Sequence, residues 1–199
     1  QYLPPPSKVR TVKHHISMPL EELQEKLKCF LPANNRTRQL ILFTILTACR
    51  VGETAGAKWS EFNFEERVWS IPPERRKDSK PYPHRVPLSD QVVELLNSIE
   101  RKGEYVFAVR DTLGSKYSLS VLLKRMTGTT ATMHGFRATF RDWAAENEIN
   151  DSVAEKCLMH SVGNAVFQAY QRSDLLELRR PVMQAWADTV FALQPFRKF

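Results

Sequence analysis

A histidine and an arginine stand three residues apart in His134-Gly-Phe-Arg137, within a stretch whose apolar residues recur at helical spacing. On a helix, positions i and i+3 lie on the same face, so both side chains would point at one place. Histidine can donate or transfer a proton, and arginine presents a fixed fork of donors that suits phosphate. The pair is a candidate for anion binding and proton transfer, although such pairs also occur on solvated helix faces.

A second arginine, Arg50, directly follows the mostly apolar segment 40–49 and stands three residues before Glu53. An arginine at the end of a buried helix is costly to leave unpaired, because burial removes the water that solvates its charge. Two interpretations remain open at this stage. Arg50 pairs with Glu53 or with a backbone carbonyl, or it is held ready for an anion.

Several other chemistries lack their sequence signatures. There is no Gly-x-x-x-x-Gly-Lys phosphate loop, and the chain contains only 7 glycines. Neither Cys-x-x-Cys nor His-Glu-x-x-His occurs, and the acidic residues do not cluster as an oxygen-ligated magnesium site requires. The adjacent His14 and His15 have no partner at ligand spacing. The sequence predicts phosphate chemistry that relies on cations and histidines, with no metal ligands and no cofactor.

The composition favours a polyanionic partner. The 199 residues include 29 Lys and Arg against 22 Asp and Glu, a formal net charge of +7. A basic balance of this size favours nucleic acid as the partner and says nothing about fold. The cysteines Cys29, Cys49 and Cys157 lie in apolar helical contexts, which predicts reduced, buried thiols in a cytosolic protein. The longest apolar run, 40–48, is too short to span a bilayer.

Hydrophobic periodicity predicts a mainly α fold with one small antiparallel β-sheet, an α+β class. Short strands are expected between residues 60 and 88, around a charged hairpin tip at 73–84. The expected helices are 19–31, 37–49, one after Ser89-Asp90, Ser118 to Met126 with Ser118 as cap, one around His134, 153–158 capped by Asp151 or Ser152, and Leu175 to Leu193. The apolar side of the last helix is expected to carry Leu178, Val182, Trp186, Val190 and Phe191.

Five motifs in order resemble the tyrosine recombinases. They are Arg50 after an apolar helix, a lysine in a β-hairpin, His134-x-x-Arg137, His160 after another apolar helix, and Tyr170 ten residues later. Three stretches of the sequence are similar to the integrases of satellite phages and genomic islands. They are the stretch from Trp69-Ser-Ile-Pro-Pro-Glu to His84-Arg-Val-Pro-Leu-Ser, the motif His134-Gly-Phe-Arg-Ala-Thr, and the stretch from Ala169-Tyr170-Gln-Arg to Met183-Gln-Ala-Trp-Ala-Asp. The resemblance covers roughly residues 20 to 193 and implies the catalytic-domain fold of that family.

The resemblance implies a role for each motif residue. Tyr170 would be the nucleophile that forms a covalent 3′-phosphotyrosine, and Arg50 and Arg137 would bind the non-bridging phosphate oxygens. His134 would assist proton transfer or hold the phosphate, and His160 would donate a hydrogen bond to it. The hairpin lysine would protonate the departing 5′-oxygen. Lys77 matches the family position best, and Lys80 in the same loop is the alternative.

The resemblance also implies an organisation and a set of partners. Residues 1–17 would be a linker from a missing upstream DNA-binding region, 18–193 the catalytic domain, and 194–199 a tail that either contacts a neighbouring subunit or is a frayed end. The expected partners are double-stranded DNA attachment sites, further copies in a tetramer on DNA, and accessory DNA-bending or excision factors, in the bacterial cytoplasm and nucleoid. The candidate DNA-contacting residues are Arg75, Arg76, Lys80, Lys116, Lys124 and Arg141. A regulator of the same fold without catalysis, and a type IB topoisomerase-like nicking enzyme, are the alternatives.

Overall fold

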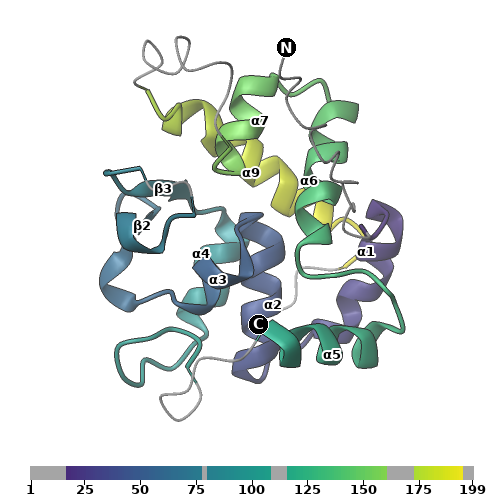
Figure 1. The fold of residues 1–199 in the computed structure, drawn as a ribbon. Helices are drawn as coiled ribbons and strands as arrows, with labels where there is room; N and C mark the ends of the chain where they lie inside the picture. Colours follow the sequence, from purple (N-terminus) through teal and green to yellow (C-terminus); the bar gives the residue numbers. More distant parts are fainter. Residues whose placement is uncertain (1–16, 78–79, 109–115, 161–172, 195–199) are drawn as a thin grey trace, which may run out of the picture.

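The computed structural model describes residues 17–77, 80–108, 116–160 and 173–194 (Figure 1). Its α-helices are α1 (Leu20–Lys26), α2 (Arg36–Thr47), α3 (Val51–Ala55), α4 (Asp90–Asn97), α5 (Lys116–Thr127), α6 (Gly135–Glu146), α7 (Asp151–Cys157) and α9 (Leu176–Val190). Its strands are β1 (Phe62–Asn63), β2 (Val68–Ile71) and β3 (His84–Pro87), and short 3₁₀ helices occur at Leu27–Phe30, Trp59–Glu61 and Pro73–Arg75. The described part is mainly helical with one small antiparallel sheet, which confirms the fold class.

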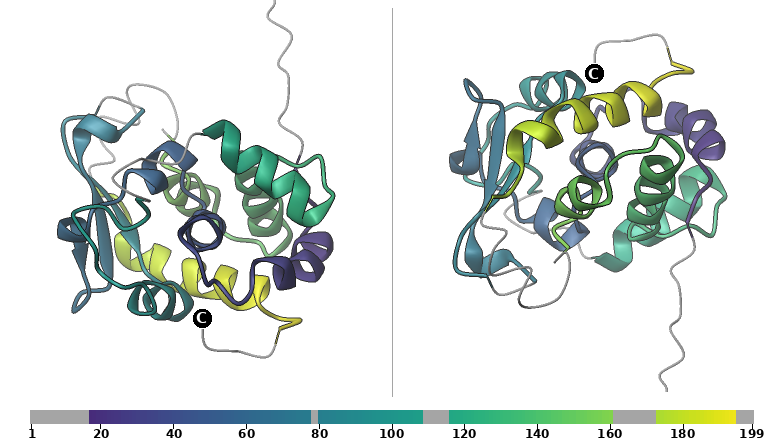
Figure 2. Two further views of the ribbon diagram at one scale, coloured as in Figure 1. Left: turned by 90° about the horizontal axis from the view of Figure 1, so that it is seen from below. Right: turned by 90° about the horizontal axis from the view of Figure 1, so that it is seen from above.

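Helix α2 is the centre of the core. Figure 2 (left) shows it nearly end-on, and it contacts α3, α4 and α9. Every residue from Gln39 to Thr47 is buried, as its nearly continuous apolar sequence predicts. The Asn35 side chain caps the helix by accepting a hydrogen bond from the Arg38 backbone N–H at 3.0 Å. The helix ends two residues earlier than expected, because Ala48 adopts the left-handed conformation with φ of 50°.

The three strands form an antiparallel sheet in the order β1-β2-β3. Trp69 lies opposite Phe62 on one side and Val86 on the other. Its fully buried ring stacks on Phe62 at 5.6 Å and contacts Phe43 of α2 at 5.1 Å. These aromatic contacts pack the sheet against α2 and fix the hairpin that carries the predicted lysines.

Two helix starts differ from the sequence expectation. Helix α7 is capped by Asn150, whose side chain accepts a hydrogen bond from the Ser152 backbone N–H at 2.9 Å, so neither Asp151 nor Ser152 is the cap. Asparagine is as good a cap as aspartate or serine, and it comes first in the chain. Helix α5 begins at Lys116, so Ser118 lies inside the helix and does not cap it. The Ser89 cap of α4 is confirmed, with its side chain accepting from the Val92 backbone N–H.

Helix α9 packs along α2 and α7, near the sheet (Figure 2, right). Val182, Trp186 and Val190 are buried as expected, but Leu178 is 58% exposed. The buried residues of the helix repeat at i+3 and i+4, and this spacing places Arg179 on the inner face in place of Leu178. A fully buried arginine therefore lies on the apolar face of α9, between the buried Leu176 and Val182.

The three cysteines are free thiols. Cys49 and Cys157 are buried as predicted, whereas Cys29 is only partly buried. Burial and the nearby Glu53 carboxylate raise the pKa of the Cys49 thiol to about 12, so it is neutral and inert near neutral pH. Among the described residues, no helix is long and apolar enough to cross a membrane.

Candidate active site

Arg137 lies on α6 at the point where the ends of α2 and α7 meet. Its guanidinium donates to the backbone carbonyls of Ala48 at 2.7 Å and Leu158 at 2.6 Å. Both carbonyls belong to residues that cap the C-terminal ends of these helices, where carbonyl groups lack partners within the helix. Only 4% of Arg137 is exposed. Its position is therefore fixed by the backbone of two other elements.

His160 follows α7 and is joined to Arg137. Its Nε2 lies 2.9 Å from Arg137 Nη2, and its Nδ1 lies 2.6 Å from Glu155 Oε2. Arginine has donors only, so Nε2 accepts and the ring proton lies on Nδ1, which donates to Glu155. Burial lowers the pKa of His160, and the positive charge of Arg137 lowers it further against the opposing effect of Glu155. His160 is therefore neutral at neutral pH and held in one tautomer.

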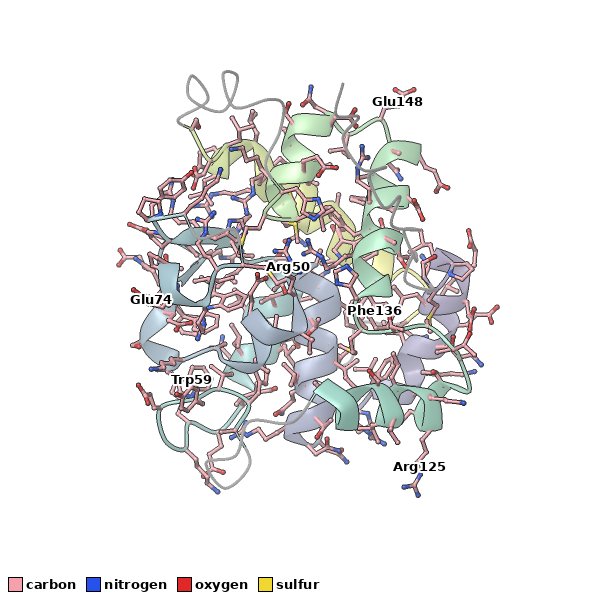
Figure 3. The ribbon with its side chains drawn as sticks, in the orientation of Figure 1. Arg50, Trp59, Glu74, Arg125, Phe136 and Glu148 are labelled. Atoms are coloured by element: carbon pink, nitrogen blue, oxygen red, sulfur yellow. The ribbon has the colours of Figure 1, made fainter. Side chains whose placement is uncertain are left out.

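Arg50 stands at the N-cap position of α3, close to the centre of the molecule in Figure 3. Its guanidinium pairs with the buried Glu53 at 3.2 Å and contacts the Met159 sulfur at 3.8 Å. The Glu53 carboxylate also accepts from the Arg50 backbone N–H at 2.8 Å. The expected pairing with Glu53 is confirmed, yet 19% of the Arg50 side chain stays exposed. Arg50 can therefore pair with Glu53 and still bind an anion through the exposed part of its side chain.

The two arginines are close enough to influence each other. Burial lowers the pKa of Arg137 to about 10, and the positive charge of Arg50 contributes to the decrease. Arg137 remains protonated at neutral pH. Two guanidinium groups side by side, with a neutral histidine beside them, are suited to bind the oxygens of a phosphate group and to stabilise added negative charge.

The other predicted site residues differ in their exposure and in the element that carries them. His134 is exposed and directly precedes α6. Lys77 is exposed in the hairpin, whereas Lys80 is partly buried and lines a pocket that includes His160. Tyr170 lies outside the described residues, as do most of the predicted linker and tail. The role of Tyr170 as nucleophile therefore stays a prediction.

The candidate DNA-contacting residues divide into paired and solvent-facing groups. Arg75 pairs with Glu61 at 2.5 Å, and Arg76 donates to the Tyr82 carbonyl at 2.8 Å. Arg141 bridges α6 to α7 through Asp151 at 2.7 Å and Glu155 at 3.0 Å. Lys124 is exposed on α5, and the side chain of Lys116 lies outside the described part. Their contacts with DNA stay predictions.

Sequence reasoning missed Glu155, His84 and Arg179. Glu155 orients His160 and precedes it by five residues, a spacing that brings the two together only because the chain turns back after α7. His84 and Arg179 fall within the stretches that carry the family resemblance, but their burial is visible only in the fold. Among the described residues, no group of three or more His, Cys, Asp or Glu residues is arranged to hold a metal ion.

The comparison with protein families decides the classification. Residues 18–176 match the model of the phage integrase family. The chain belongs to this family. The prophage integrase IntA of Escherichia coli K12 is 35% identical over 163 residues, which cover 78% of this chain and 39% of that protein. The integrase of enterobacteria phage P4 is 31% identical and covers 88% of this chain and 45% of its own length.

Solved structures show the same fold as this phage integrase family member. The integrase from mycobacterium phage Brujita aligns with a TM-score of 0.65 at 19% identity, over 98% of this chain and 62% of that one. A lambda integrase dimer bound to a COC′ core site aligns with a TM-score of 0.58 at 17% identity, over 84% of this chain and 62% of that one. The chain spans half or less of the length of the curated relatives.

Proposed function

We propose that this chain is the catalytic domain of a site-specific DNA recombinase that integrates and excises a mobile element. The observation that carries the proposal is the cluster of Arg50, Arg137 and His160, which three separate elements bring together around one place. The cluster provides positive charge and hydrogen-bond donors for a phosphate, and these residues stand in the order of the family motif. Double-stranded DNA is the substrate that fits the basic composition.

The reaction would proceed by transesterification. The Tyr170 hydroxyl loses its proton and attacks the scissile phosphorus, which forms the 3′-phosphotyrosine bond and breaks the bond to the 5′-oxygen. That oxygen takes a proton from Lys77, and Arg50 and Arg137 stabilise the extra negative charge of the five-coordinate phosphate. Attack by the 5′-hydroxyl of a second strand reverses these steps. Since the phosphotyrosine keeps the energy of the phosphodiester, the cycle requires neither ATP nor a redox cofactor.

His160 and His134 would assist the same phosphate. With Nδ1–H held by Glu155, the Nε2 of His160 is directed at Arg137 and so at the site where the phosphate would lie. Protonation of this ring in the DNA complex would convert it to a second donor. His134, at the start of α6, would contact the phosphate or carry the proton from Tyr170.

The proposed assembly follows from strand exchange between two duplexes. Four copies would act as a tetramer on two attachment sites, with accessory DNA-bending or excision factors, in the bacterial cytoplasm and nucleoid. Lambda integrase, a structural neighbour, is described as a dimer bound to its core site. This neighbour supports a DNA-bound multimer as the functional form.

The test is covalent attachment to DNA. Nicked suicide duplexes from the ends of the mobile element trap the adduct, because the cleaved strand diffuses away and religation is prevented. We expect a denaturant-resistant adduct for the wild-type protein in EDTA and none for Tyr170→Phe, with unchanged DNA binding. Tyr105→Phe is the matched control and should form the adduct normally. Tyr105 forms a β-bridge with Lys58, whose Nζ lies over the Tyr105 ring.

Two outcomes would contradict the proposal. A normal adduct from Tyr170→Phe would assign the nucleophile elsewhere. Absence of adduct from a wild-type protein that binds the duplex, with its upstream domains present, would favour a DNA-binding regulator without catalysis. Relaxation of supercoiled plasmids that lack an attachment site, with no recombinant product, would favour the topoisomerase-like activity.

A further inference from the structure

A pocket next to His160 is lined mostly by positively charged and titratable side chains. They come from the β-hairpin, α7 and α9, and we call this site the α7–β3 pocket: Arg76, Lys80, His84, Lys156, His160 and Arg179. The rest of its wall is formed by Tyr82, Pro83, Met159 and Asp174. The cluster of Arg50, Arg137 and His160 uses only His160 of this set. Arg76 and Lys80 are candidate DNA contacts, and Lys80 is also the alternative general acid, whereas Lys156 and Arg179 have no assigned role.

Two of these side chains are buried and carry nitrogen atoms without hydrogen-bond partners. Arg179 is 0% exposed, and its Nη1 donates to the Asp174 backbone carbonyl at 3.3 Å. Its Nε and Nη2 have no partner among the described residues, and neither has Nε2 of His84, which is 6% exposed. A buried donor without an acceptor costs roughly 1–3 kcal/mol, and more when the group is charged. Such groups are rare in folded proteins, and a bound anion that accepts from them is one explanation of their presence.

The acidic groups near Arg179 do not balance this charge. The Asp174 carboxylate is bound on both oxygens by Arg85, at 2.8 and 2.9 Å. Burial raises the pKa of the Cys157 thiol beside Arg179, so that group is neutral at neutral pH. Asp174 is thus committed to Arg85 at the edge of the pocket. The buried guanidinium of Arg179 has no carboxylate of its own within the described part of the chain.

The cations also repel one another. Burial lowers the pKa of Lys156, and the positive charges of Lys80 and Arg179 lower it further. His84 has a pKa well below its ordinary value because of burial and the charges of Arg179 and Arg76. A fold that holds these groups around one space gains stability when an anion enters, because the anion attracts all of them at once.

We propose that the α7–β3 pocket binds a second phosphate of the DNA backbone, one that flanks the scissile phosphate. This inference rests on the proposed function. His160 forms part of both sites, so a strand held at the Arg50–Arg137 cluster has its neighbouring phosphates near this pocket. A backbone phosphate carries negative charge close to Lys156 and the acceptor oxygens that the buried nitrogens of Arg179 and His84 lack.

The pocket would act by fixing the register of the strand. A phosphate held by Arg179 and Lys156 positions the next phosphate against Arg50 and Arg137 without taking part in bond breaking. Contacts to phosphate fix the position and orientation of DNA and carry no sequence information. The pocket therefore serves every attachment site equally.

A methylphosphonate scan tests the pocket. This substitution replaces one charged phosphate oxygen by a methyl group, and it is placed singly at the two positions on each side of the scissile phosphate. Affinities are measured in the Tyr170→Phe background of the full-length protein, so that cleavage does not contribute. We expect one flanking position at which the substitution weakens binding about tenfold, as expected for loss of a charge-assisted contact. Lys156→Gln should weaken binding to unmodified DNA by a similar factor.

The decisive result is non-additivity. At that flanking position, the methylphosphonate should reduce the affinity of the Lys156→Gln protein by less than about twofold. The variant has already lost the interaction between Lys156 and that phosphate. Lys102→Gln is the matched control: its side chain is 72% exposed and pairs with Glu100, away from the pocket-lining set. The methylphosphonate should reduce the affinity of the Lys102→Gln protein by the full factor of about ten. Thermal unfolding midpoints of both variants verify that each is folded.

The outcomes separate this inference from the proposed function. Additive effects of Lys156→Gln and the methylphosphonate at every flanking position would overturn the phosphate pocket, even if the wild-type protein forms its adduct. Equal non-additivity in Lys102→Gln would also overturn it, because the effect would then be one of net charge. Non-additivity confined to Lys156→Gln, together with absence of adduct from the protein that retains Tyr170, would support the pocket and contradict catalysis.

Discussion

At the scale of single residues, the hairpin lysines present a choice that chemistry can resolve. Lys77 matches the family position and is exposed, whereas Lys80 is partly buried in the α7–β3 pocket. A general acid is needed only when the leaving group is a poor one. An alkoxide requires a proton as it departs, but a thiolate does not, since thiols ionise near pH 8.5.

We predict that Lys77→Ala slows cleavage by about 10²–10⁴-fold on normal DNA, as expected for loss of a general acid. On a duplex with sulfur in place of the bridging 5′-oxygen, the variant should cleave at nearly the wild-type rate. Lys80→Ala is the matched variant. Its cleavage should stay slow on the sulfur-containing duplex, because Lys80 is proposed to bind a phosphate and not to protonate the leaving group. Single-turnover adduct formation on both duplexes measures the effect. The reverse pattern, with sulfur restoring only Lys80→Ala, would transfer the acid role to Lys80.

From the sequence, Arg50 was expected either to pair with Glu53 or a backbone carbonyl or to be held ready for an anion, and the structure shows the pair with Glu53 at 3.2 Å. The family resemblance placed Arg137 and His160 in one site, and the structure joins these two at 2.9 Å. Sequence reasoning could not predict that Arg179 would be buried. A charged residue at the start of a long amphipathic helix is usually solvated. Its burial depends on contacts with β3 and α7, which are distant in sequence.

At the scale of elements, helical and strand periodicity predicted the order of α2, the sheet, α4, α6, α7 and α9. The errors fall at helix ends and at one helix face. The α7 cap is Asn150, and the α9 face includes Arg179 in place of Leu178. A shift of one residue on a helix is a rotation of about 100°, so a small error in phase exchanges a buried residue for an exposed one.

The inner face of α9 is expected to dominate its contribution to stability. Trp186 is fully buried, donates its Nε1–H to the Ile45 carbonyl at 2.9 Å, and contacts Phe140 edge-on at 5.4 Å. We predict that Trp186→Ala lowers the free energy of unfolding by about 3–5 kcal/mol, because it leaves a cavity and an unpaired carbonyl. Leu178→Ala on the same helix should change it by less than about 0.5 kcal/mol. Urea denaturation measures both, and similar losses would contradict the assigned face.

At the scale of the whole molecule, a net charge of +7 attracts DNA, but the site of each charge decides whether it contacts a phosphate. Much of the positive charge is already committed. Arg141, Arg75 and Arg85 pair with carboxylates inside the fold, whereas Lys124 is exposed on α5. Arg75, Lys124 and Arg141 were predicted from the sequence as DNA contacts, and the sequence could not separate the paired from the exposed ones, because pairing depends on the packing of distant elements.

Salt dependence separates a phosphate contact from net charge. Each phosphate that a protein neutralises adds about −0.9 to the slope of log K against log salt concentration. Lys124→Gln and Lys102→Gln each remove one positive charge from exposed surface, so a net-charge effect would change both slopes equally. We predict that Lys124→Gln makes the slope shallower by about 0.9 and that Lys102→Gln leaves it unchanged. Equal changes would assign affinity to the overall field of the protein, and an unchanged slope in both would remove Lys124 from the DNA interface.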